Sequence, residues 1–205
     1  MTDGGGKGGG GKGGGGQGGG KGGGTRRNAG PVFTHLDETG RARMVDVTGK
    51  PVTERRATAR CIVRASPGAL EAAAKDEDFV PFAKAAGIHG AKQTPFLIPL
   101  CHPLPLDDVD VRVDLDIPGG AAAIRVSTSV VAKTGIEVEA LTACGFAGLT
   151  LLMALRHYDP DAVLTTLALW HKSGGRSGTW ERTEQTWERT GDRQTRADQI
   201  APPQT

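Results

Sequence analysis

The longest apolar pattern in the chain runs through residues 133–158. Gly145 to Leu155 is almost unbroken apolar sequence, a run too long for an ordinary strand and too short to cross a bilayer. Lys-Thr-Gly at 133–135 predicts a strand end, and Asp-Pro at 159–160 predicts a helix stop. The pattern therefore predicts a helix of about 20 residues that begins near Ile136. Three of its small residues favour close packing against a sheet: Gly145, Ala147 and Gly148.

Shorter patterns predict four strands. Val109–Ile117 alternates apolar and polar residues, so one face of this strand is buried and the other is wet. The Pro-Gly-Gly turn at 118–120 leads into Ala122–Ala132, and the two strands together predict a hairpin. Ala57–Ala65 predicts the first strand, and Ala162–Trp170 predicts the last one.

The segment between the first strand and the hairpin predicts a helix followed by irregular structure. Ser66-Pro67 is typical of an N-cap and first helical position, and the helix runs loosely towards Ala86. Prolines at 95, 99, 103 and 105 predict that residues 87–108 form no regular helix. The resulting β-α-β-β-α-β order predicts an α+β fold of the ferredoxin-like, split βαβ type, with an antiparallel sheet and helices on one face.

Composition divides the chain into three parts. More than half of the 32 glycines precede Thr25, so residues 1–30 are predicted to be a disordered Gly/Lys-rich arm. Residues 181–205 are polar, repeat TWERT and are predicted to be a disordered tail, which leaves one domain at 31–180. The net charge of +2 comes from an arm of +4, a core near −1 and a tail of −1, so the basic character belongs to the arm.

Several classes of protein are disfavoured by composition. Aromatic residues make up 4% of the chain without the pattern of an RNA-binding strand, which argues against a specific nucleic-acid partner. Cys61, Cys101 and Cys144 have no CxxC or finger spacing, so we expect neither a disulfide framework nor a metal site, and no cofactor. No apolar leader and no run of 18 apolar residues is present, so we expect a cytoplasmic protein without a membrane span.

The first candidate for chemistry is the proline-rich stretch 87–108. It holds Lys92 and His102, and its prolines restrict the backbone that carries them. Lysine supplies charge for phosphate binding or acid–base work, and histidine titrates near neutrality. The alternative, a surface connection with an incidental lysine and histidine, stays open.

The second candidate is the stretch HKSGGRSG at residues 171–178. Its glycines and serines let backbone N–H groups converge, while Lys172 and Arg176 add positive charge. That combination suits an anion such as phosphate. A flexible glycine-rich exit into the tail is the alternative.

Two charged pairs lie at the ends of predicted elements. Arg55-Arg56 precedes the first strand, where solvated surface arginines are the alternative to a binding role. Glu137 and Glu139 lie in the first turn of the long helix, where they either take part in a site or only complement the helix dipole.

Five stretches of this sequence together resemble one known family. They are MVDVTGK (44–50), AGIHGAKQT (86–94), LIPLCHPLPL (97–106), KTGIEVEALTACG (133–145) and HKSGGRSG (171–178). The sequence resembles the cyclic pyranopterin monophosphate synthase accessory family of molybdenum cofactor biosynthesis. The PLCHPL and KTGxExEALT strings are highly specific for this resemblance.

The resemblance implies an enzyme, a lyase acting on a nucleotide-derived small molecule. It would convert 3',8-cyclo-7,8-dihydro-GTP to cyclic pyranopterin monophosphate and release pyrophosphate. The resemblance also implies a ferredoxin-like fold and a homo-hexamer, a trimer of dimers with sites at subunit interfaces.

Residue roles follow from the same resemblance by matching positions. The catalytic residues implied are Lys92, His102, Arg156 and Lys172. The substrate-binding residues implied are Arg55, Leu100, Cys101, His102, Val138 and Glu139.

Four positions depart from the family pattern. Met153 stands where the family has a catalytic aspartate, and Arg156 stands where it has a lysine. Asp76 replaces a further family lysine, and Val138 replaces a methionine. A thioether cannot accept a proton as a carboxylate does, and arginine stays protonated. Three readings therefore stay open: the family reaction, a repurposed enzyme for a related purine nucleotide, and a non-catalytic binding or assembly subunit.

Overall fold

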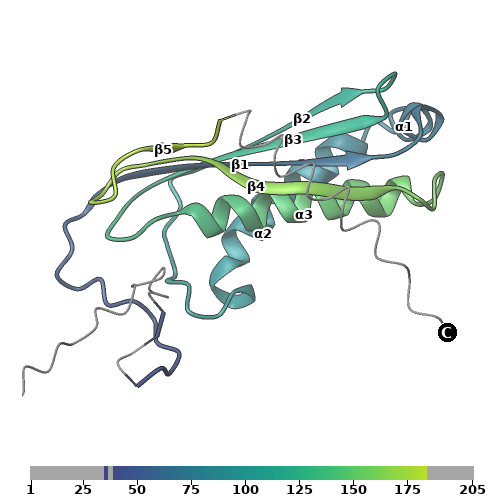
Figure 1. Cartoon of the computed structure of the whole chain (residues 1–205). Coiled ribbons are helices and arrows are strands. Elements are labelled where there is room, and N and C mark those ends of the chain that lie inside the picture. Colours follow the sequence, from purple (N-terminus) through teal and green to yellow (C-terminus); the bar gives the residue numbers. More distant parts are fainter. Residues whose placement is uncertain (1–34, 37–38, 184–205) are drawn as a thin grey trace, which may run out of the picture. The chain divides into compact units, whose positions relative to one another are not determined.

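The computed structural model describes residues 35–36 and 39–183, which belong to one compact unit (Figure 1). The predictions made for residues 1–30 and for the tail beyond Thr183 lie outside the described residues. The elements are β1 (Thr53–Arg64), α1 (Pro67–Ala73), α2 (Phe79–Leu97), β2 (Asp108–Asp116), β3 (Ala121–Ala132), α3 (Glu137–Leu155), β4 (Val163–Ser173) and β5 (Trp180–Glu181).

The strands form one antiparallel sheet in the order β2-β3-β1-β4-β5. The helices α2 and α3 cover one face of this sheet, and no helix formed by residues 35–36 and 39–183 lies on the other face (Figure 1). This arrangement confirms the expected α+β, ferredoxin-like fold. The short strand β5 is an addition at the β4 edge, and the single helix expected after β1 is divided into α1 and α2.

The core lies between the sheet and α3. Alternate residues of β1, including Ala57, Ala59 and Cys61, are buried and face the helices, as the period of two along a strand requires. A Cβ added at Gly148 of α3 would lie 2.8 Å from the Leu164 Cδ1 atom and 3.1 Å from the Cys61 Sγ atom. The close helix–sheet packing expected from the small residues of this helix is confirmed.

The helix α3 is apolar because it is a core helix. Its full 19 residues are long and apolar enough to cross a membrane by length and composition alone, although the apolar run Gly145–Leu155 within it is shorter. However, α3 packs against β1, β3, β4 and α2, and its inward side chains are fully buried. This packing explains the apolar composition of α3, and no contact with a bilayer is needed to explain it.

The expectation of irregular structure over residues 87–108 is wrong for its first half. The helix α2 continues to Leu97 and contains Pro95 in its last turns. The helix persists because Gly87 and Gly90 pack tightly on α3: a Cβ at Gly90 would lie 2.8 Å from the Phe146 ring. Tertiary packing therefore outweighs the hydrogen bond that Pro95 cannot make. The chain is irregular from 98 to 107, as expected.

Candidate active site

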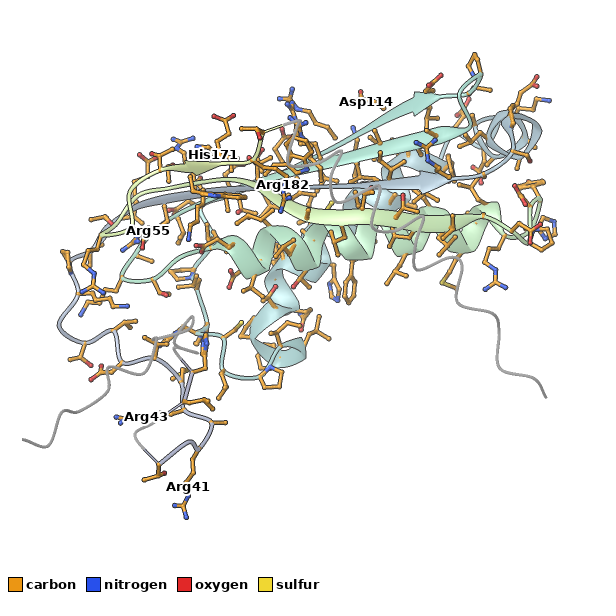
Figure 2. The ribbon with its side chains drawn as sticks, viewed as in Figure 1. Arg41, Arg43, Arg55, Asp114, His171 and Arg182 are labelled. Carbon is orange, nitrogen blue, oxygen red and sulfur yellow. The ribbon has the colours of Figure 1, made fainter. Side chains whose placement is uncertain are left out.

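A cavity of about 630 Å³ opens at one end of the sheet. Its walls come from the start of β1, the β3–α3 connection with the first turn of α3, and the end of β4 with the loop that follows. Arg55 marks this end of the molecule in Figure 2. Residues far apart in sequence therefore meet here because β1 lies between β3 and β4 in the sheet.

The cavity is strongly cationic. Its described lining includes one carboxylate, Glu137, and six basic side chains: Lys50, Arg55, Arg56, Lys133, Lys172 and Arg176. The Lys172 Nζ atom lies 3.1 Å from a Glu137 carboxylate oxygen, and both side chains are about one third exposed (34% and 29%). This excess of positive charge in a concave site attracts and holds anions.

The glycine-rich loop at 174–178 forms a wall of the cavity and is built around left-handed backbone. Gly174, Gly175 and Gly178 have φ values of 94°, 68° and 65°. A side chain at Gly175 would overlap the Arg55 guanidinium, which itself donates from Nη1 to the Gly174 carbonyl at 3.3 Å. Glycine is needed there because the loop lies directly on the start of β1.

This loop is a hairpin and not a flexible exit. Lys172 pairs with Trp180 and His171 pairs with Glu181, so the chain turns back along β4 immediately after the loop. The alternative of a flexible connection into the tail is therefore wrong for the described residues. The expected anion-binding stretch, with Lys172 and Arg176, does line the cavity.

Glu139 lies two residues beyond Glu137 on α3 and is almost fully buried, with 3% of its surface exposed. Burial raises the pKa of its carboxyl to about 7, and the nearby charge of Glu137 adds to this rise. Glu139 therefore holds a proton at neutrality part of the time and can give or take one. Neither glutamate only complements the helix dipole, because Glu137 pairs with Lys172 and Glu139 is in the core.

Cys101 lies close to Glu139. Burial and the Glu139 charge both raise the pKa of the Cys101 thiol, so this group stays protonated at neutral pH and is not an activated nucleophile. Cys101, His102 and Leu100 are all half-buried in the irregular segment after α2, outside the lining of the cationic cavity. Leu100 has a φ of 69°, which is strained for a branched residue.

Three other predicted site residues lie apart from the cavity. Lys92 is exposed on α2, and Val138 is half-buried in the first turn of α3. Arg156 is exposed at the C-terminal end of α3, about 28 Å along the helix from Glu137 at 1.5 Å per residue. Met153, in the last turns of the same helix, is 77% exposed. One copy of the chain does not bring Arg156 or Met153 to the cavity.

Two basic residues of the cavity were not singled out from the sequence as binding residues: Lys50 and Lys133. Both lysines adjoin a glycine or a glycine-containing turn, in Gly49-Lys50 and Lys133-Thr134-Gly135. The Lys133 Nζ donates to the Thr48 carbonyl at 2.9 Å and ties the segment before β1 to the β3–α3 connection. The sequence signal that could have identified these two lysines is a basic residue beside a glycine at the end of a strand or helix.

Metal ligation is not evident in this part of the chain. Among residues 35–36 and 39–183, no three His, Cys, Asp or Glu side chains gather closely enough to hold a metal ion. The charged side chains that line the cavity carry ammonium, guanidinium and carboxyl groups.

The fold and the cavity together define a class: α+β proteins of ferredoxin-like fold with a cationic cavity suited to a polyanionic small molecule, and with a buried carboxyl of near-neutral pKa two residues along α3 from the cavity wall. Comparison with known proteins narrows this class. The family model described as the MoaC family matches residues 44–175. The chain belongs to the MoaC family.

Individual relatives agree with this assignment. A cyclic pyranopterin monophosphate synthase of Thermomicrobium roseum is 45% identical over 155 residues, which cover 74% of this chain and 93% of the relative. Synthases of the same name from Nocardioides sp. and Streptomyces avermitilis are 46% and 44% identical over 154 residues. These alignments cover 73% of this chain and 94% and 89% of the two relatives.

Proposed function

We propose that this chain converts 3',8-cyclo-7,8-dihydro-GTP to cyclic pyranopterin monophosphate and releases pyrophosphate, an early step of molybdenum cofactor biosynthesis. The observation that carries the proposal is the cavity with six basic side chains. It is supported by relatives named cyclic pyranopterin monophosphate synthase that are aligned over almost their whole length.

The basic side chains suit the triphosphate of such a substrate. In the proposed reaction a substrate hydroxyl attacks the first phosphorus, its proton passes to Glu139 or to water, and the bond between this phosphorus and the departing pyrophosphate breaks. Arg55 and Lys172 neutralise the charge that develops on the pyrophosphate oxygens. The Glu137–Lys172 ion pair holds Lys172 at the cavity until a phosphate competes for it.

In the proposal, Glu139 is the residue that gives and takes protons within a single copy of the chain. Its pKa of about 7 matches a group that exchanges protons near neutrality. In the proposal Leu100, Cys101 and His102 contact the rest of the substrate, and Lys92 of another copy faces the phosphates. These roles rest on the family match and on the proximity of Cys101 to Glu139.

A homo-hexamer, a trimer of dimers, forms part of the proposal. Arg156 stands at the family's lysine position but lies about 28 Å along α3 from the cavity of its own chain. An interface between copies would bring this end of α3 to a neighbour's cavity. A cytoplasmic location stays a prediction that cell fractionation tests.

A second candidate function is a non-catalytic binding subunit. Met153 stands at the family's catalytic aspartate position and offers no carboxylate. In this reading the cavity binds the nucleotide and the chemistry is absent, or is supplied by an active paralogue within a mixed assembly.

Single-turnover conversion of the cyclised dihydro-GTP separates the two functions. Purified protein and its Met153→Asp variant are mixed with the substrate, and the pterin product is measured. Product from the parent supports the proposed enzyme. Product from the variant alone supports the binding subunit, and no product from either, despite substrate binding, rejects the proposed reaction.

A further inference from the structure

The register between β1 and β4 shifts at two places, and the first shift, between Thr58 and Ala59, inserts one extra residue into β4. Thr58 of β1 pairs with His171, and the next residue, Ala59, pairs with Leu169. Trp170 therefore has no counterpart on β1 and forms a β-bulge. A bulge shifts the alternation of side chains along its strand and re-aims those beyond it.

This shift decides where Lys172 points. Leu169 pairs with buried Ala59 and packs on the core, so strict alternation would turn His171 towards the helices and Lys172 towards the open face. Because of the bulge, His171 lies with Thr58 on the open face (Figure 2). Lys172 instead lies opposite buried Ala57 on the helix side.

The contact that results is the one at the cavity. On the helix side, the Lys172 Nζ reaches the Glu137 carboxylate at 3.1 Å and lines the cationic cavity. With the opposite alternation the same ammonium would be on the far face of the sheet from α3. The bulge at Trp170 is thus a condition for the position of Lys172.

Two arginines hold the bulge, Arg60 through its side chain and Arg182 through both its backbone and its side chain. The Arg60 guanidinium lies 4.1 Å from the Trp170 ring centroid on the open face. Arg182 donates its backbone N–H to the Trp170 carbonyl at 2.8 Å and its Nε–H to the Leu169 carbonyl at 2.9 Å. Arg182 follows directly after β5, so the returning strand also secures the bulge.

We propose that Arg60, Trp170 and Arg182, here named the bulge clamp, are positioning residues that set Lys172 at the cavity from the opposite side of the sheet. Arg60 and Trp170 line a separate hollow of about 340 Å³ with Asp114 and Arg125. The clamp thus acts on the cavity through the backbone of β4. The relevance of the bulge clamp to catalysis rests on the proposed function. Its effect on the position of Lys172 is independent of that function.

The first test measures Lys172 directly and needs no substrate. Arg182→Leu removes the Nε–H donor, and Trp170→Leu removes the ring under Arg60. Acetylation of individual lysines is followed by mass spectrometry. We expect the labelling rate of Lys172 to rise several-fold in both variants, because the ammonium leaves Glu137, while that of Lys133 stays constant.

The second test measures anion binding with inorganic triphosphate by calorimetry. Arg182→Leu should weaken triphosphate binding about tenfold. This factor corresponds to the loss of one charge-assisted hydrogen bond, the one that Lys172 would donate to the triphosphate. Arg182→Lys, which keeps a donor, should recover part of the affinity. In a Lys172→Ala background Arg182→Leu should have no further effect, because a positioning residue acts only through the group that it positions.

Arg112→Leu is the matched control. Arg112 is an exposed arginine of the same sheet face that pairs with Asp110 and lies outside the clamp, so neither readout should change. Unchanged Lys172 labelling in the folded Arg182→Leu and Trp170→Leu proteins would overturn the clamp. Faster labelling with unchanged triphosphate affinity supports the clamp and instead removes Lys172 from the proposed phosphate site.

Discussion

The Glu139 carboxyl combines deep burial with a position two residues from the cavity wall. Its pKa rises from 4.5 to about 7 because water is excluded and Glu137 is close. A carboxyl removed from water in this way weakens the fold once it ionises. The fold retains this group at a cost, which is typical of residues kept for function.

This cost predicts how stability depends on pH. The folded-state pKa of Glu139 lies above its unfolded value, so the folded protein loses stability as pH rises from 4.5 to about 7. The full loss is about 3 kcal/mol at 1.36 kcal/mol per pKa unit. We expect Glu139→Gln to be more stable than the parent by up to this amount at pH 8.

Urea unfolding of both proteins at pH 8 and pH 5 measures this prediction. The advantage of Glu139→Gln should shrink strongly at pH 5, where the parent carboxyl is protonated in the folded state. An equal difference at both pH values would show that ionisation of Glu139 is not its cause.

The helix α3 and the sheet approach each other closely along one line of small residues. Gly148 lies on this line, facing Leu164 and Cys61, whereas Gly145, one turn earlier, has only an ordinary contact of 3.5 Å with the Leu167 Cδ2 atom. Two glycines in one helix therefore differ in the space beside them. This difference allows helix propensity and packing to be separated.

Gly145→Ala should stabilise the protein by up to about 1 kcal/mol, because alanine has a higher helix propensity than glycine. Gly148→Ala gains the same propensity but forces a methyl group against Leu164 and Cys61. Overpacking typically costs about 1–3 kcal/mol, so we expect a net loss of stability. Chemical denaturation of the two variants measures this; an equal gain in both would show that the sheet yields at Gly148.

The helical side of the described chain exposes large apolar side chains. They are Phe82 (69% exposed), Phe96 (83%), Leu97 (44%), Leu149 (49%) and Met153 (77%). Apolar surface of this kind, together with the distance of Arg156 from the cavity, supports assembly into an oligomer. The proposed hexamer places the two ends of α3 at one site through contact between copies.

Light scattering tests the assembly. The 21.3 kDa chain should give a particle of six chains. Phe96→Asp should dissociate it, because a charge in a buried interface is costly to desolvate. Lys84→Asp, at an exposed polar position of the same helix, is the control and should leave the particle intact. A monomeric parent would contradict the hexamer and the shared site with it.

Much of the fold was accessible from local pattern. The hairpin β2–β3 and the start of α3 agree with the sequence prediction to within about one residue, because alternation and a long apolar run are properties of contiguous residues. The extent of α2 was not accessible in this way. Pro95 argued for irregular structure, and only the packing of Gly87 and Gly90 on α3 explains the longer helix.

The site residues likewise fall into those recognisable from local sequence and those that only the tertiary structure brings together. The sequence alone determined that Lys172 and Arg176 lie on a glycine-rich stretch able to bind an anion, and that Arg55 is basic and near a strand start. Only the tertiary structure decided that Lys50, Lys133 and Glu137 join them, because the sheet order brings three distant segments to one end. It also decided the side of the sheet on which Lys172 lies, because a one-residue bulge reverses the alternation that the sequence implies.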